Sequence, residues 1–118
     1  MPFVMLILEP REQRARRTPE EGRAVYGRMV RFAEDLKDRG LLEGVSSLRP
    51  DREGTRVTVR EGAPALVDGP FTETKEMIGG FFHLACTTRE EALDIARACP
   101  AAEWTSLEVR EAGPCYED

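Results

Sequence analysis

The stretch LVDGPFTETKEMIGGFFHLAC, residues 66–86, places a tight turn directly before an apolar run. In this turn, Asp68 can hydrogen-bond its own downstream backbone, Gly69 accepts a positive φ, and Pro70 fixes φ at about −65°. Phe71 follows and can anchor the turn in the core. The run IGGFFHLAC is rich in aromatic and branched residues, which is typical of a strand. The stretch therefore predicts a structural corner that turns the chain into a core strand.

Patterns on either side of this stretch predict the other elements. The run Thr18-Pro19-Glu20-Glu21 is a capping box with proline at the first helical position, and Gly40 is a C-terminal cap, so a helix is expected over about 19–39. A second capping box, Thr88-Arg89-Glu90-Glu91, opens a helix that Pro100 ends. Strands are expected where the residues are apolar throughout or alternate: 3–8, 41–48, 55–60, 63–67 and 104–111.

The order of these elements is strand, long helix, strand, hairpin, strand, short helix, strand. Each half is a strand–helix–strand unit, which fits a ferredoxin-like α+β sandwich with an antiparallel sheet and both helices on one face. The hairpin is an insertion in this plan. Because no repeat, linker or low-complexity stretch divides the sequence, we expect a single domain over residues 1–118.

The expected sheet is apolar on both faces, although helices can cover only one of them. Alternation places Phe81 and Phe82 on opposite faces, and it divides the first strand in the same way. An uncovered apolar face of this size is unfavourable for a monomer. We therefore expect a homodimer whose two sheets pack face to face. The two sets in the first strand are Phe3, Met5 and Ile7, and Val4, Leu6 and Leu8.

Charge limits the class of partner. At a net charge of −5, the chain lacks the basic surface that phosphate neutralisation requires, so nucleic acid is not expected as a partner. One local cluster of arginines is either a solvated loop, softened by Glu9 and Glu12, or an anion-facing edge. This cluster consists of Arg11, Arg14, Arg16 and Arg17.

The cysteines argue against a metal-binding protein, and the opening segment argues against a membrane protein. Cys86, Cys99 and Cys115 have no CxxC or Cys/His spacing, so we expect no metal site, and we expect no cofactor. Two of these thiols are expected to be buried, and one lies near the tail. The opening MPFVMLIL is too short for a membrane span and has no cationic leader, so a cytoplasmic protein is expected.

Polar residues that follow the corner suggest a pocket. Glu73 and Lys75 precede the pair Gly79-Gly80, whose missing side chains let another group approach the backbone closely. Carboxylate, lysine and hydroxyl groups beside such a gap fit a polar pocket floor, with Asp68 as general acid or base and Lys75 as anion partner. A solvated loop has the same composition, so both interpretations stay open.

Residues elsewhere are weaker candidates. Arg56 and Arg60 share one face of the hairpin and can bind a carboxylate or phosphate in a bidentate manner, although exposed strand arginines usually solvate a sheet. Glu9 ends the first strand. Trp104 is most simply a core or interface aromatic residue.

Several runs of this sequence resemble those of a known protein family. The runs VDGPFTETKEMIGGFF, FVMLILEP and SLEVRE, with Tyr26 ahead of LKDRGLL, resemble the DGPF-domain branch of the YCII-related family over nearly the whole chain. The resemblance implies a dimeric α/β barrel, with a cleft between sheet and hairpin or at the dimer interface, and no agreed activity. It also implies a link to extracytoplasmic-function sigma factors, because family members are often encoded beside them or fused to them.

The wider family is thought to use a histidine in the first helix together with an aspartate. Asp68 corresponds to the motif aspartate, but the first helix of this chain contains no histidine, and Tyr26 and Met29 stand where a partner is expected. His83 lies on the strand after the glycine pair, on the face of Phe81. A single histidine on a strand is more often a packed residue than a base.

Two hypotheses follow, and the sequence does not decide whether the protein is an enzyme. The first is a small-molecule-binding protein or weak enzyme. It has Asp68 and Lys75 at the mouth of a cleft that Tyr26 and His83 line, and further ligand-binding candidates are Glu73, Gly79, Gly80 and Arg60. The second is a regulatory interaction module that binds a sigma factor, with the DGPF run as a structural corner. A DNA-contacting regulator is disfavoured by the net charge.

Overall fold

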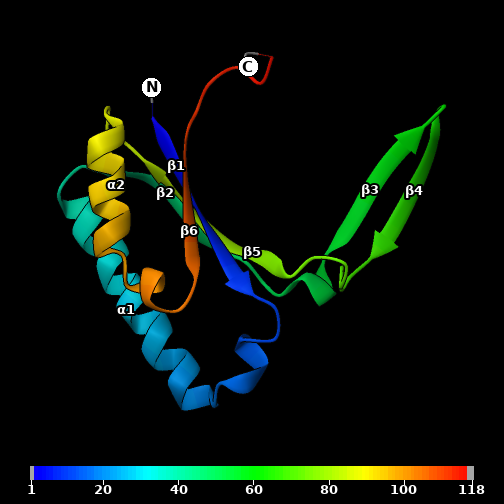
Figure 1. Ribbon diagram of the computed structural model, residues 1–118, viewed down its shortest axis with the longest axis horizontal. Coiled ribbons are helices and arrows are strands. Elements are labelled where there is room, and N and C mark those ends of the chain that lie inside the picture. Colours follow the sequence, from blue (N-terminus) through cyan, green and yellow to red (C-terminus); the bar gives the residue numbers. More distant parts are fainter. Residues whose placement is uncertain (1, 117–118) are drawn as a thin grey trace.

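The computed structural model describes residues 2–116, and its elements follow the expected order (Figure 1). Short 3-10 helices, η1 (Arg14–Arg16), η2 (Asp51–Glu53) and η3 (Pro100–Glu103), lie between the larger elements. The helices and strands are β1 (Phe3–Pro10), α1 (Pro19–Asp38), β2 (Leu42–Ser47), β3 (Thr55–Arg60), β4 (Ala63–Asp68), β5 (Glu76–Leu84), α2 (Arg89–Ala98) and β6 (Ser106–Glu111).

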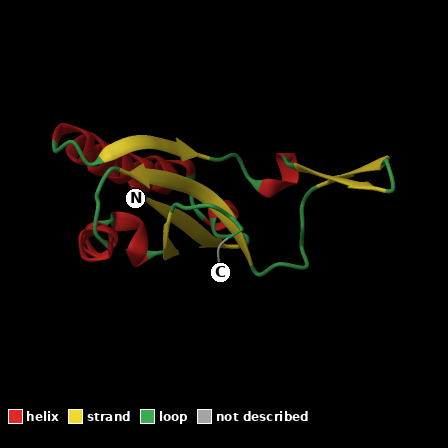
Figure 2. Cartoon of the chain, turned by 90° about the horizontal axis from the view of Figure 1, so that it is seen from above, coloured by secondary structure: helices red, strands yellow, loops and turns green. Residues whose placement is uncertain are grey.

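Four strands form one antiparallel sheet in the order β2-β5-β1-β6. Both helices lie on one side of this sheet (Figure 2). This is the order in which two strand–helix–strand units interlock in a ferredoxin-like sandwich. The predicted α+β class and ferredoxin-like architecture are therefore confirmed, and β3 and β4 form the inserted hairpin.

Local capping signals fix where the helices begin. The Thr18 hydroxyl accepts the amide of Glu21 at 3.1 Å, and the Glu21 carboxylate accepts the amide of Thr18 at 2.9 Å. Thr88 likewise accepts the amide of Glu91 at 3.2 Å. These bonds satisfy amides that the first helical turn leaves without partners. After α1 the chain reverses at Gly40, whose φ is +72°.

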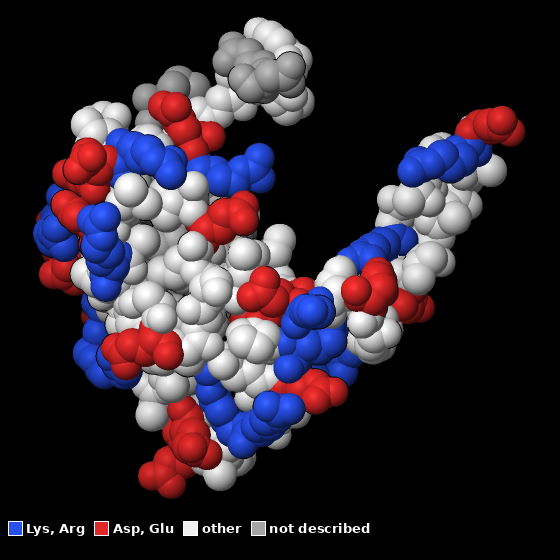
Figure 3. All heavy atoms as spheres, in the orientation of Figure 1, with Lys and Arg blue, Asp and Glu red and all other residues white. Residues whose placement is uncertain are grey.

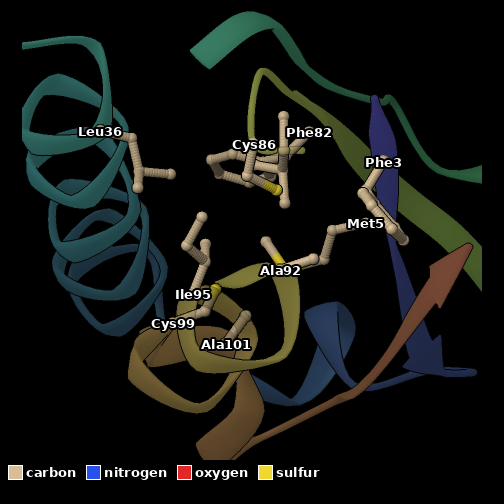
Figure 4. Close-up of a cluster of buried hydrophobic side chains, with 10 residues drawn as sticks. Phe3, Met5, Leu36, Phe82, Cys86, Ala92, Ile95, Cys99 and Ala101 are labelled. Atoms are coloured by element: carbon tan, nitrogen blue, oxygen red, sulfur yellow. The ribbon is translucent and has the colours of Figure 1, made fainter. Parts of the chain in front are cut away.

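The core lies between the sheet and its two helices (Figure 4). From the sheet, Met5, Phe82 and Leu84 are almost fully buried, and Leu36 of α1 and Ile95 of α2 pack against them. Burial of this apolar surface is the main stabilising contribution to the fold. Two cysteines are buried and one is exposed, as predicted: Cys86, Cys99 and Cys115, in that order.

The β3–β4 hairpin projects from the side of the molecule opposite the helices (Figures 1 and 3). All of its strand residues are exposed, including the apolar side chains of Val57 and Leu66. Positive and negative side chains are interspersed on both the hairpin and the body of the molecule (Figure 3). The hairpin therefore depends on its base for its position.

That base is the predicted structural corner. Asp51 accepts two hydrogen bonds from the Arg11 guanidinium, at 3.0 and 2.7 Å, and one from the Phe71 amide at 3.3 Å. Phe71 is buried, as the sequence suggested. Gly69 packs so closely that a methyl group there would lie 1.8 Å from the Asp51 carbonyl oxygen. The corner thus needs glycine because of a close approach between two backbone segments.

None of the helices in residues 2–116 combines the length and apolar character that crossing a membrane requires.

Candidate functional site

A cavity of about 400 Å³ lies between the end of β1, the η1 segment, the first turns of α1 and the η3 segment. Small-molecule sites typically measure about 300–1,000 Å³ and combine apolar walls with a few polar groups. This cavity has both features, since charged, aromatic and aliphatic side chains line it: Ile7, Glu9, Arg14, Arg17, Tyr26, Met29 and Trp104.

Glu9 is the buried charged residue of this cavity. Strand alternation places its side chain on the face of β1 that carries Met5 and Ile7, beneath α1, and only 6% of Glu9 is exposed. Gly79 of β5 provides the space, because a methyl group there would lie 2.7 Å from Glu9 Cδ. Gly79 also forms a bulge, since Ile7 pairs with Gly80 and Leu8 with Ile78. The group that lies against this glycine is the Glu9 carboxylate.

Arg14 lies beside the Glu9 carboxylate. Its Nε is 2.7 Å from Glu9 Oε1, and its terminal nitrogens donate to the carbonyls of Leu48 at 2.7 Å and Gly79 at 3.3 Å. Arg14 thus covers Oε1, which is closed to solvent, and the ion pair leaves the other carboxylate oxygen without a second charged partner. Arg14 therefore joins the end of β1 to β5 and leaves acceptor capacity on Glu9.

Burial raises the pKa of Glu9 above its ordinary value of 4.5, because the charged form is poorly solvated there. The positive charges of Arg14 and Arg17 oppose this shift without cancelling it. A carboxyl group with a raised pKa beside a cavity is typical of functional sites, although ion pairs in a structural network also shift pKa values.

Arg17 and Trp104 form another wall of the cavity. The Arg17 guanidinium carbon lies 5.9 Å from the centre of the Trp104 ring, and that of Arg28 lies 5.3 Å from it. Gln13 holds both residues, since it accepts from Arg17 at 3.2 Å and donates to the Trp104 carbonyl at 2.6 Å. Arg17 thus presents a cation next to an aromatic face inside the cavity.

Two of the residues that the sequence suggested, Tyr26 and Gly79, line this cavity. Tyr26 is 58% exposed, so its ring stands at the edge of the cavity. Gly80 lies next to Gly79, but its position is fixed by β2, because a methyl group there would lie 2.7 Å from the Ser46 carbonyl oxygen.

The candidates near the corner lie elsewhere. Asp68 is exposed at the end of β4 and accepts the Thr55 hydroxyl at 2.8 Å. Glu73 is paired with Arg56 of the hairpin. Lys75 is exposed, and its backbone carbonyl accepts the Arg11 amide at 3.1 Å. These side chains belong to the hairpin and its base and do not line the cavity at Glu9.

The remaining candidates occupy two further regions. His83 lies on the open face of the sheet, where its Nε2 is 3.5 Å from a Glu43 carboxylate oxygen. Arg60 ends β3 at the tip of the hairpin and donates to the carbonyl of Val59. The structure therefore distributes the suggested residues among the cavity, the corner, the hairpin and the open sheet face.

Glu9, Arg17 and Trp104 are visible in the sequence only as separate features. In the sequence, Glu9 is an acidic residue at the end of an apolar strand, Arg17 belongs to an arginine cluster, and Trp104 is a single tryptophan. Only the fold brings them together, since η1 and η3 are 84 residues apart at the nearest, from Arg16 to Pro100. Within residues 2–116, no group of His, Cys, Asp and Glu side chains has an arrangement that could hold a metal ion.

The fold and the cavity describe a small ferredoxin-like α+β protein with a cavity beneath its first helix. The chain belongs to the YCII-related family, whose domain model matches residues 1–114. An uncharacterised protein of Rhizobium meliloti (strain 1021) is 33% identical over 78 residues, which are 66% of this chain. The match spans 63% of that protein's length. Neither the family's description nor the relative's name assigns an activity.

Proposed function

We propose that this protein binds a small organic molecule in the cavity at Glu9. The main support is the Glu9 carboxylate, which is buried at the cavity wall with Arg14 as its ion-pair partner. A buried carboxylate is unfavourable unless its acceptor sites are filled, and a ligand that donates a hydrogen bond to this carboxylate lowers that cost. The cavity is also of a size that suits such a ligand.

The other side chains of the cavity define what the ligand offers. Arg17 attracts an anionic group, while Trp104 and Met29 provide apolar surface. Arg14 is less available, because its nitrogens already contact Glu9 and two backbone carbonyls. The proposed ligand therefore combines a hydrogen-bond donor, a negative charge and an apolar part.

A thermal-shift screen of a metabolite library tests this proposal. A ligand that binds the folded chain alone raises the melting temperature by an amount that grows with the logarithm of its concentration divided by Kd. We expect the effect of true ligands to be lost in Glu9→Gln and Arg17→Ala and retained in Asp68→Ala. Ligands that still stabilise Glu9→Gln but no longer stabilise Asp68→Ala would place the site at the hairpin base instead.

A second candidate function is catalysis of proton transfer at Glu9. A carboxyl group with a pKa raised by burial exchanges protons closer to neutral pH than an exposed one does. The raised pKa makes Glu9 a better candidate for proton transfer than Asp68, which is exposed and accepts a hydrogen bond from Thr55. Mass spectrometry of ligands incubated with the protein in D2O tests the idea, since replacement of a carbon-bound ligand proton by deuterium should require Glu9 and persist in Asp68→Ala.

We also propose that two copies associate through the open face of the sheet. The helices cover the opposite face (Figure 2), which leaves the half-buried side chains of Val4, Leu6 and Phe81 without a layer above them. Covering this face with a second sheet would bury apolar surface and form the family's dimeric barrel.

We also propose a link to an extracytoplasmic-function sigma factor, which the family resemblance supports, and a cytoplasmic location, in which such a partner is available. Co-purification of the tagged chain with a sigma factor encoded beside it tests the partner. Fractionation of the producing cells tests the location. If the sigma factor is the functional partner, its binding should survive Glu9→Gln, because that substitution alters only the cavity.

A further inference from the structure

A second cavity of about 340 Å³ adjoins the first one along α1. The two cavities share lining residues from β1, β2, β5 and α1, so they meet beneath the first helix. The shared residues are Ile7, Tyr26, Met29, Ser47 and Gly79. The proposed function uses the first cavity alone. The side chains of the second cavity therefore give independent evidence about the ligand.

The second cavity is mainly apolar. Ala33 of α1, Val45 of β2 and Phe82 of β5 line it, and its charged residues, Glu34 and Lys37, come from the second half of α1. Val45 is 44% exposed although it shares the helix-covered face of the sheet with Phe82. Exposed apolar side chains along a groove are typical of a binding surface.

The length of the combined site indicates an elongated ligand. On α1 the lining runs from Pro19 in the first cavity to Lys37 in the second. At 1.5 Å of rise per residue, this part of the helix spans about 27 Å. One end of the site carries Glu9 and Arg17, and the middle is apolar. Charge and apolar surface are therefore separated along its length.

We infer that the two cavities together hold one amphipathic molecule, an apolar acid that carries a hydroxyl group near its carboxylate. The carboxylate lies at Arg17, the hydroxyl donates to the Glu9 carboxylate, and the apolar chain extends along α1 past Val45. This inference rests on the proposed function, because it uses the same cavity for the polar end. It adds the class of ligand and a second set of contacts.

Fluorescence titration with 2-hydroxy acids of increasing chain length tests this inference. Trp104 is the only tryptophan of the chain and lines the first cavity, so it reports on binding of the polar end. From 2-hydroxybutanoate to 2-hydroxydecanoate, we expect the Kd to fall roughly fourfold for each methylene that enters the groove. Decanoate, which lacks the hydroxyl, should bind more weakly than 2-hydroxydecanoate to the wild type. This difference in Kd should shrink in Glu9→Gln, because a neutral amide oxygen is a weaker acceptor than a carboxylate.

Val45→Asp tests the second cavity separately from the polar end of the site, because Val45 lines only the second cavity. It should remove the dependence of Kd on chain length while leaving 2-hydroxybutanoate binding unchanged. Val57→Asp on the hairpin is the matched control and should behave as the wild type, because Val57 is exposed far from the groove. If Val45→Asp fails to fold, Val30→Asp on α1 alters the same cavity from the other side.

The outcomes distinguish this inference from the proposed function. Binding with the same Kd at every chain length would overturn the amphipathic ligand and leave the polar cavity standing. No change in Trp104 fluorescence with any of these acids would also overturn this ligand class, while ligands from the metabolite screen would still uphold the proposed function. A shift from dimer to monomer in Val45→Asp, measured by ultracentrifugation, would show that a second copy covers the groove instead.

Discussion

At the scale of single residues, the Glu9 and Gly79 pair determines what the cavity can do. A carboxylate buried beneath a helix is costly unless charges or hydrogen bonds compensate for it. Arg14 provides the charge, and the missing side chain of Gly79 provides the space. The result is a buried carboxylate that is fixed in position at the wall of the cavity.

Gly79→Ala should therefore destabilise the fold. The added methyl group would lie 2.7 Å from Glu9 Cδ, so either the bulge in β5 or the Glu9 side chain must move. We expect a loss of about 1–3 kcal/mol in the free energy of unfolding, measured by urea denaturation. Gly27→Ala is the matched control, since it meets only Arg31 at 3.5 Å and should stabilise α1 by about 0.5–1 kcal/mol. Equal stability of the two variants would contradict this account of Gly79.

Glu9→Gln should change how stability depends on pH. The folded chain holds the Glu9 proton more tightly than the unfolded chain does, because burial raises the pKa above 4.5. The free energy of unfolding of the wild type is therefore expected to fall as pH rises from 4.5 through the folded pKa.

The glutamine variant cannot titrate at this position, so this part of the fall should be absent. Urea denaturation at a series of pH values would show the difference in stability, Glu9→Gln minus wild type, growing with pH and then levelling off above the folded pKa of Glu9. A constant difference, or one that shrinks as pH rises, would show that the carboxyl group is not desolvated in the folded chain.

At the scale of secondary-structure elements, the hairpin is held by its base. An isolated two-stranded hairpin is marginally stable in water. Here Asp51 bonds the Arg11 guanidinium and the Phe71 amide, so the end of β1, the η2 segment and the corner are joined at one carboxylate. The DGPF run thus serves as a structural corner, as one interpretation of the sequence proposed.

Asp51→Ala should loosen the hairpin and leave the sheet intact. The Arg11 side chain and the Phe71 amide lose their acceptor, so amide hydrogen exchange over residues 55–68 should accelerate roughly tenfold. Asp94→Ala removes an exposed ion pair with Arg97 on α2 and serves as the control. If both variants exchange like the wild type over these residues, the hairpin does not depend on Asp51.

The elements were more predictable from the sequence than the site was. Capping boxes at Thr18 and Thr88 and the apolar run of β1 are local signals, and the structure contains the elements that they predict. The cavity has no such local signal, because Glu9 and Trp104 are brought together only when η3 returns to α1. The polar run after the corner has the composition of a pocket floor, but its Glu73 carboxylate pairs with Arg56 of the hairpin.

At the scale of the whole molecule, the proposed dimer predicts a specific effect of Leu6→Glu. Leu6 lies on the open face between Phe81 and Glu108, where a second sheet would bury it. We expect the wild type to sediment as a dimer at micromolar concentration and Leu6→Glu to sediment as a monomer that keeps its helical content. Val57→Glu on the exposed hairpin should remain dimeric. A monomeric wild type would refute packing through this face.

The central claim is that the cavity at Glu9 is the binding site of this YCII-related protein. A crystal structure of the protein soaked with ligands from the thermal-shift screen tests it most directly. We predict electron density for the ligand inside the cavity, with a donor within hydrogen-bond distance of the Glu9 carboxylate and contact with the Trp104 ring. Ligand density beside Asp68 at the hairpin base, together with an empty cavity, would contradict the claim.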